Sequence, residues 1–80
     1  MSEGLKRAIA AARHTQERVV AEKQELDEKL EKLLAFIGDG KGPIFSTLVT
    51  EEQERLTTQA RIMREYSDIL TDRIAAFGGK

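Results

Sequence analysis

The sequence predicts an all-α protein, an antiparallel helical hairpin with a short N-terminal helix, assembled as a homo-oligomer. Apolar residues recur at helical spacing in two long segments. A single run of glycines and proline separates these segments, Gly38-Asp39-Gly40-Lys41-Gly42-Pro43. A chain of 80 residues without cysteine has a marginal core and no disulfide. Association of identical copies is therefore the expected source of additional stability.

The first expected element is a short helix over residues 3–13, which Ser2 can cap. Its apolar residues share one face, namely Leu5, Ile9 and Ala12. The pattern weakens at His14, and Thr15 is a suitable N-cap for a new helix. We therefore expect a change of direction near His14.

The second expected element is a long helix over residues 15–37. Glu22 and Lys23 interrupt its apolar seam, which otherwise keeps the helical period. The residues of this seam are Val19, Leu26, Leu30, Leu33 and Ile37, and it is widened by Val20 and Leu34.

A loop over residues 38–49 follows. Gly38 is well placed just after the helix, where a residue with positive φ ends many helices. The later glycines and Pro43 prevent an immediate restart. Three apolar residues of the loop are expected to cover the open end of the hairpin, namely Ile44, Phe45 and Leu48.

The last expected element is a long helix over residues 51–76. Thr50 and Gln53 fit a capping box, in which each side chain bonds the backbone N–H of the other residue. The expected seam consists of Leu56, Ala60, Met63, Leu70, Ile74 and Phe77, flanked by Ile62, Tyr66 and Ile69.

Composition excludes several classes of function. The 13 basic and 14 acidic residues give a net charge of -1, which argues against binding of a nucleic-acid polymer but not of a small anion. With one histidine and no cysteine, we expect no metal site and no cofactor. No sequence pattern places a base beside a nucleophile, so we do not expect an enzyme. The chain has no apolar run long enough for a membrane span, and we expect it in the cytosol.

Two cations are more informative, because they lie on or beside the apolar seams. Lys29 falls between Leu26 and Leu33, and Arg73 between Leu70 and Phe77. Each long side chain can extend past the seam to water, which is the ordinary explanation. In a closed oligomer, however, symmetry repeats each cation around an axis. Such a group of cations suits phosphates, and cyclic oligonucleotides combine phosphate charge with near-symmetry.

The residues that carry a family resemblance are His14-Thr15-Gln16-Glu17-Arg18-Val19-Val20-Ala21-Glu22-Lys23-Gln24-Glu25-Leu26-Asp27-Glu28-Lys29-Leu30, Lys32-Leu33-Leu34-Ala35-Phe36-Ile37, Phe45, Leu48, Glu54-Arg55-Leu56, Gln59, Met63, Tyr66, Leu70 and Arg73-Ile74. This pattern resembles the phage helical-hairpin family that includes the anti-CBASS cyclic-nucleotide sponge and the hairpin domain of an anti-Thoeris sponge. The resemblance covers about residues 14 to 76.

The resemblance implies a compact hexamer in the cytoplasm of an infected bacterial host. Members of the family bind cyclic oligonucleotide signals without cleaving them, which keeps the defence effector inactive. In that family, cyclic dinucleotides bind between paired subunits, and cyclic trinucleotides can bind on three-fold axes.

The resemblance also suggests ligand-binding residues. His14 stands where the family has a tyrosine, which leaves less stacking area, and Lys29 matches the family's lysine fifteen residues later. Arg73 is the best match to the arginine of the trinucleotide site. Arg18 lies one helical turn after His14, and we add it as a phosphate ligand from its spacing alone.

Two other classes of function stay open at this point. A structural hairpin, such as a phage assembly or scaffold protein, would use Lys29 and Arg73 as ordinary paired charges. An adaptor for a partner protein would form a heterologous complex and ignore nucleotides.

Overall fold

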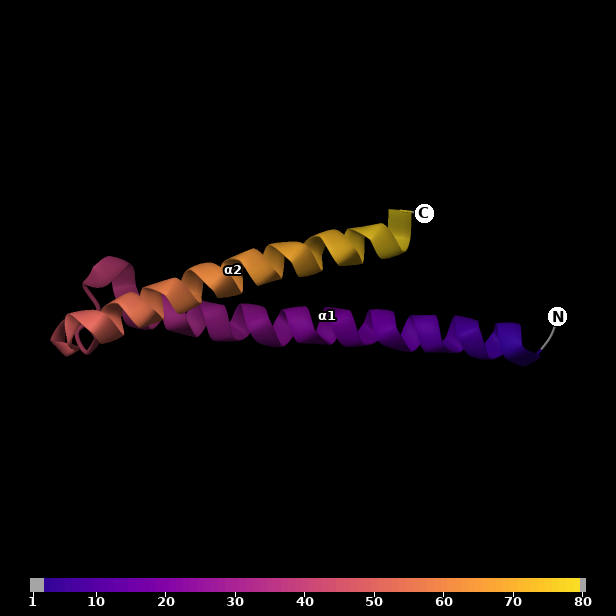
Figure 1. The fold of residues 1–80 in the computed structure, drawn as a ribbon, viewed down its shortest axis with the longest axis horizontal. Coiled ribbons are helices and arrows are strands. Elements are labelled where there is room, and N and C mark those ends of the chain that lie inside the picture. The colour runs from indigo at the N-terminus through magenta and orange to yellow at the C-terminus, as the bar shows by residue number, and fades with distance from the viewer. Residues whose placement is uncertain (1–2, 80) are drawn as a thin grey trace.

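The computed structural model describes the backbone of residues 3–79 and the side chains of residues 15–77. Helix α1 (Glu3–Ile37) is followed by two 3₁₀ turns (Gly38–Gly40 and Phe45–Thr47) and by helix α2 (Thr50–Gly79). α2 folds back along α1, so the connecting turns lie at one end of a rod and both termini at the other (Figure 1). Within residues 3–79, neither helix has an apolar stretch long enough to cross a membrane. The predicted all-α hairpin is confirmed.

The expected break near His14 is wrong, because α1 is continuous through it. One helix replaces the two that we expected over residues 3–13 and 15–37. Residues 5–37 contain neither glycine nor proline. Histidine, threonine and glutamine each cost no more than about 0.7 kcal/mol in a helix interior, which is too little to stop propagation. The side chain of His14 lies outside the described residues.

The core follows the predicted seams of both helices. One cluster, near the turn, consists of Leu30, Ile37, Phe45 and Ala60, with Leu33, Leu48, Leu56 and Met63 packed against it. Farther along the rod, Val19 and Leu70 are also buried, and Leu70 is completely so. The residues predicted to flank the seams stay largely exposed. Ile62 and Ile69, for example, are 52% and 55% exposed.

The turn depends on close backbone approach at Gly42. Gly38 has φ +54°, which confirms its predicted role at the end of the helix. The N–H of Gly42 then donates to the carbonyl of Ile37 at 3.0 Å. A Cβ on Gly42 would lie 2.0 Å from the carbonyl oxygen of Phe36, so no larger residue fits without moving the backbone.

The predicted apolar cover of the loop is correct for Phe45 and Leu48 and wrong for Ile44. Phe45 is 4% exposed and meets the ring of Phe36 edge to face, with ring centroids 6.4 Å apart. Ile44 is 63% exposed. Consecutive residues of a turn point in different directions, so only one of these two neighbours can face the core.

The start of α2 also differs from the expected capping box. The helix begins at Thr50, and the carbonyl of Val49 accepts the first backbone hydrogen bonds, from Glu52 and Gln53. The side-chain amide of Gln53 instead donates to the carbonyls of Phe45 and Leu48, both at 3.0 Å. Gln53 therefore attaches the loop to α2. α2 ends at Gly79, beyond the predicted end at residue 76.

Replacing Phe45 with alanine is expected to lower the free energy of unfolding by about 3 to 5 kcal/mol, because it leaves a cavity under the turn. Ile44→Ala is the matched control and should cost about 0.5 kcal/mol or less, since its side chain is exposed. Urea unfolding at one fixed protomer concentration measures both changes. Equal losses for the two neighbours would contradict this description of the core.

Candidate functional site

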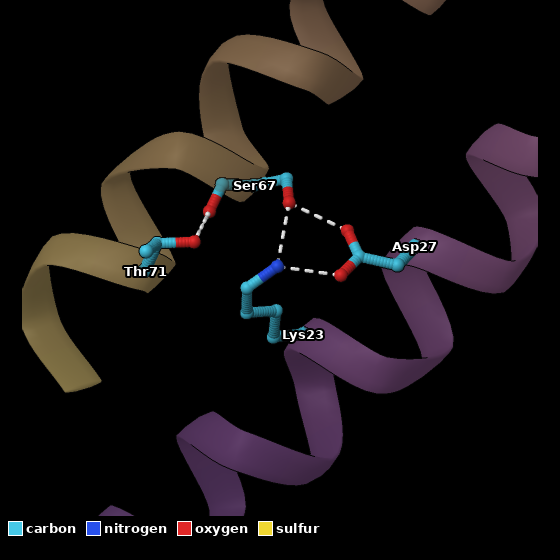
Figure 2. Close-up of polar contacts among 4 residues, drawn as sticks. All are labelled: Lys23, Asp27, Ser67 and Thr71. Atoms are coloured by element: carbon cyan, nitrogen blue, oxygen red, sulfur yellow. Dashed lines mark hydrogen bonds and ion pairs between the residues drawn. The ribbon is translucent and has the colours of Figure 1, made fainter. Parts of the chain in front are cut away.

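A polar contact crosses the middle of the hairpin. Lys23 and Asp27 of α1 point toward Ser67 of α2 (Figure 2). The ammonium of Lys23 lies 2.5 Å from Asp27 Oδ2 and donates to Ser67 Oγ at 3.1 Å, while the Ser67 hydroxyl donates to Asp27 Oδ1 at 2.5 Å. Ser67 is 7% exposed, so this contact satisfies a hydroxyl that the interface has taken out of water.

The interruption of the seam at Lys23 is visible in the sequence, but its partner Ser67 was not predicted. The expected seam of α2 passed from Met63 directly to Leu70. Steps of four and three residues place Ser67 between them on the same face, so helical spacing was the signal that could have found it. Sliding α2 by one turn, so that Met63 took the place of Ser67, would set the Lys23 ammonium against an apolar side chain, at a cost in free energy. The contact therefore favours one register of the two helices.

A second contact joins the helices at the surface. The hydroxyl of Tyr66 donates to a carboxylate oxygen of Glu22. This hydrogen bond raises the pKa of Tyr66 above its usual value, because the phenolate would lose it and face the negative carboxylate. Arg73, seven residues after Tyr66 on α2, has a smaller and opposite effect on that pKa. The Tyr66 side chain remains accessible, since the residue is 40% exposed.

This contact brings three of the four predicted ligand residues to one side of the hairpin. On α1, Arg18 lies four residues before Glu22 and Lys29 seven residues after it, so the three share a face. On α2, Arg73 shares a face with Tyr66 in the same way. Since Glu22 and Tyr66 touch, both faces border one surface, which we call the Glu22–Tyr66 side; its members are Arg18, Glu22, Lys29, Tyr66 and Arg73.

The three cations of this side are exposed and have no acidic partner among the described side chains. Across residues 15–77, none of Arg18, Lys29 and Arg73 forms a hydrogen bond or ion pair. Other cations do pair with acids, in the contacts Lys23–Asp27, Arg55–Glu52 and Arg61–Glu65. Lys29 and Arg73 lie beside the buried seam and reach water directly.

The surface around these cations carries charges of both signs. Glu22 and Glu25 lie on the same face of α1 as Lys29. One copy therefore presents no strongly positive patch. A tight site for an anion would need cations from more than one copy.

A groove among the described side chains lies elsewhere. It has a volume of about 750 Å³ and runs beside the turn, between Leu34, Phe45 and the first half of α2. Arg61 and Arg64 line it, whereas Arg18, Lys29 and Arg73 do not. No group of three His, Asp or Glu side chains within the described set is placed to hold a metal ion.

A protein-family model described as Sequestin matches residues 13–76, which include both faces of the Glu22–Tyr66 side. No curated protein and no solved structure matches the chain.

The contact around Asp27 predicts a dependence of stability on pH. Lys23, and after it Ser67, hold the pKa of Asp27 below its ordinary value of 3.8 by hydrogen bonding to the carboxylate. A lowered folded-state pKa stabilises the protein above pH 3.8, and this stabilisation is lost as the pH falls through the folded-state pKa. Asp27→Asn should lower the melting temperature at pH 7 and flatten its decline below about pH 4.

Thermal melts between about pH 2.5 and 7 measure this effect, because that interval brackets the carboxyl titration. Asp68→Asn is the control, since Asp68 is exposed on α2 and makes no hydrogen bond within residues 15–77. Parallel melting curves for the wild type and Asp27→Asn would contradict the assignment.

Proposed function

Because the chain belongs to the Sequestin family, whose name describes sequestration, we propose that it holds cyclic oligonucleotide second messengers and keeps them from their effector. The ligand is bound without cleavage. In this proposal the protein acts for a phage in the cytoplasm of the infected bacterial host. Its ligands are cyclic dinucleotides and cyclic trinucleotides.

The observation that supports this ligand class is the set of uncommitted cations on one side of the hairpin. Arg18 and Arg73 carry guanidinium groups, which match two phosphate oxygens at once, and Lys29 adds a compact charge. Charge-assisted hydrogen bonds to phosphate are among the stronger polar interactions available to a protein. A ligand can bind cations that have no acidic partner without first breaking an ion pair.

The site requires several copies of the chain. A two-helix hairpin covers one stripe of each helix and leaves the flanks uncovered, as the exposed Val20, Leu34, Ile62 and Ile69 show. Burying such flanks against identical copies stabilises an oligomer. Symmetry repeats the three cations together with Glu22 and Glu25, so the small positive excess of each copy adds up around the bound ligand. We propose a hexamer, as the family resemblance implies.

Ligand titration of two single variants tests the proposal. Lys29→Ala is expected to weaken cyclic dinucleotide binding by about 10- to 100-fold, the usual cost of a charged hydrogen bond, while Arg73→Ala weakens cyclic trinucleotide binding by a similar factor. Isothermal titration calorimetry of both variants with both ligand classes measures these changes. Arg61→Ala is the control, because Arg61 lies on the same helix but lines the groove away from this side.

Two further measurements separate this proposal from a purely structural role. A ligand at 100 times its dissociation constant stabilises the folded state by about 2.7 kcal/mol, which gives a clear thermal shift. Denaturing the complex should return the cyclic nucleotide intact. No thermal shift with any cyclic di- or trinucleotide would refute the proposal and favour a scaffold protein without a ligand. Native mass spectrometry would give the number of subunits.

A further inference from the structure

We propose, resting on the function above, that Tyr66 and Glu22 form a base-recognition element that selects guanine in a cyclic trinucleotide whose phosphate is bound by Arg73. The element combines an exposed aromatic ring, a carboxylate at its hydroxyl end and a cation on the same helix face.

Tyr66 is suited to stack on a nucleobase. The residue is 40% exposed on a single hairpin. The hydrogen bond to Glu22 holds the ring by its hydroxyl, so little conformational freedom is lost when a base stacks on it.

Glu22 is suited to select the base. A carboxylate only accepts hydrogen bonds, and it has room for about four. Tyr66 uses one oxygen, Oε2, and Oε1 has no partner in the part of the chain with described side chains. Guanine presents two adjacent donors on its Watson–Crick edge, N1–H and the N2 amino group. Adenine presents one donor beside an acceptor, which the carboxylate repels. A base lying on the Tyr66 ring would present this edge to Glu22.

Arg73 is suited to bind the phosphate of the same ligand. It lies two helical turns from Tyr66, or about 10 Å along the axis at 1.5 Å per residue. Its guanidinium is exposed and, within residues 15–77, has no acidic partner. Glu22 repels phosphate, so the ligand has one favourable orientation, with a base at Tyr66 and a phosphate toward Arg73.

The chain offers a direct spectroscopic probe, because Tyr66 is its single tyrosine and it has no tryptophan. We would titrate the wild type with a cyclic trinucleotide of three adenines and with one of two adenines and one guanine, following the Tyr66 ring protons by NMR. Stacking should move these signals upfield. Calorimetry should show about tenfold tighter binding of the guanine-containing ligand, since a matched base edge gives roughly that discrimination.

Three variants test the separate roles. Tyr66→Ala should weaken the guanine-containing ligand by about tenfold or more, whereas Tyr66→Phe, which keeps the ring, should lose much less. Glu22→Gln should remove the preference for guanine. Glu25→Gln is the matched control, because Glu25 lies on the same face of α1 without touching Tyr66, and it should retain the preference. Circular dichroism verifies that each variant keeps its helical content.

The outcomes separate this inference from the proposed function. If the wild type binds no cyclic nucleotide, both are refuted. If it binds cyclic dinucleotides only, or binds trinucleotides without moving the Tyr66 signals, this inference is refuted and sequestration stands. Equal affinity for the two trinucleotides, or an unchanged guanine preference in Glu22→Gln, would also overturn it.

Discussion

The contact between Lys23, Asp27 and Ser67 is the interaction on which the arrangement of this protein depends. Two helices that meet along an apolar seam can slide past each other at modest cost, because apolar contacts are not directional. A charged pair bonded to a buried hydroxyl is directional and tolerates one register. That register decides that Glu22 lies beside Tyr66, and therefore that the cations of α1 and α2 border the same surface.

The second constraint is that a hairpin has too few elements to cover itself. Each helix buries one stripe, and apolar flanks of both helices stay exposed on a single hairpin. The charges of one copy nearly balance on this side. Arg18, Lys29 and Arg73 stand among Glu22 and Glu25, so one copy is nearly neutral on this side. Strong attraction for an anion would arise when an oligomer sets several such surfaces around one ligand.

Sequestration places few chemical demands on a protein of this kind. It needs a shaped, charged surface and tight binding, but no group that makes or breaks bonds. The groove beside the turn is lined by none of Arg18, Lys29 and Arg73, so the concave surface and the exposed cations lie at different places on this hairpin. Accessible cations without acidic partners, and an accessible ring tied to a carboxylate, are the more informative features.

The sequence by itself determined the helical segments, the turn and most buried positions, because helical period, glycine and proline act through neighbouring residues. Local sequence signals predicted the wrong structure in two places. At His14 a weak interruption of the apolar pattern does not end the helix. Of the neighbours Ile44 and Phe45, Phe45 alone turns inward. Only the tertiary structure decided that Gln53 holds the loop, that Ser67 meets Lys23 and that Tyr66 meets Glu22. The two interhelical contacts join residues 44 positions apart, and their pairing depends on the register of the packed helices.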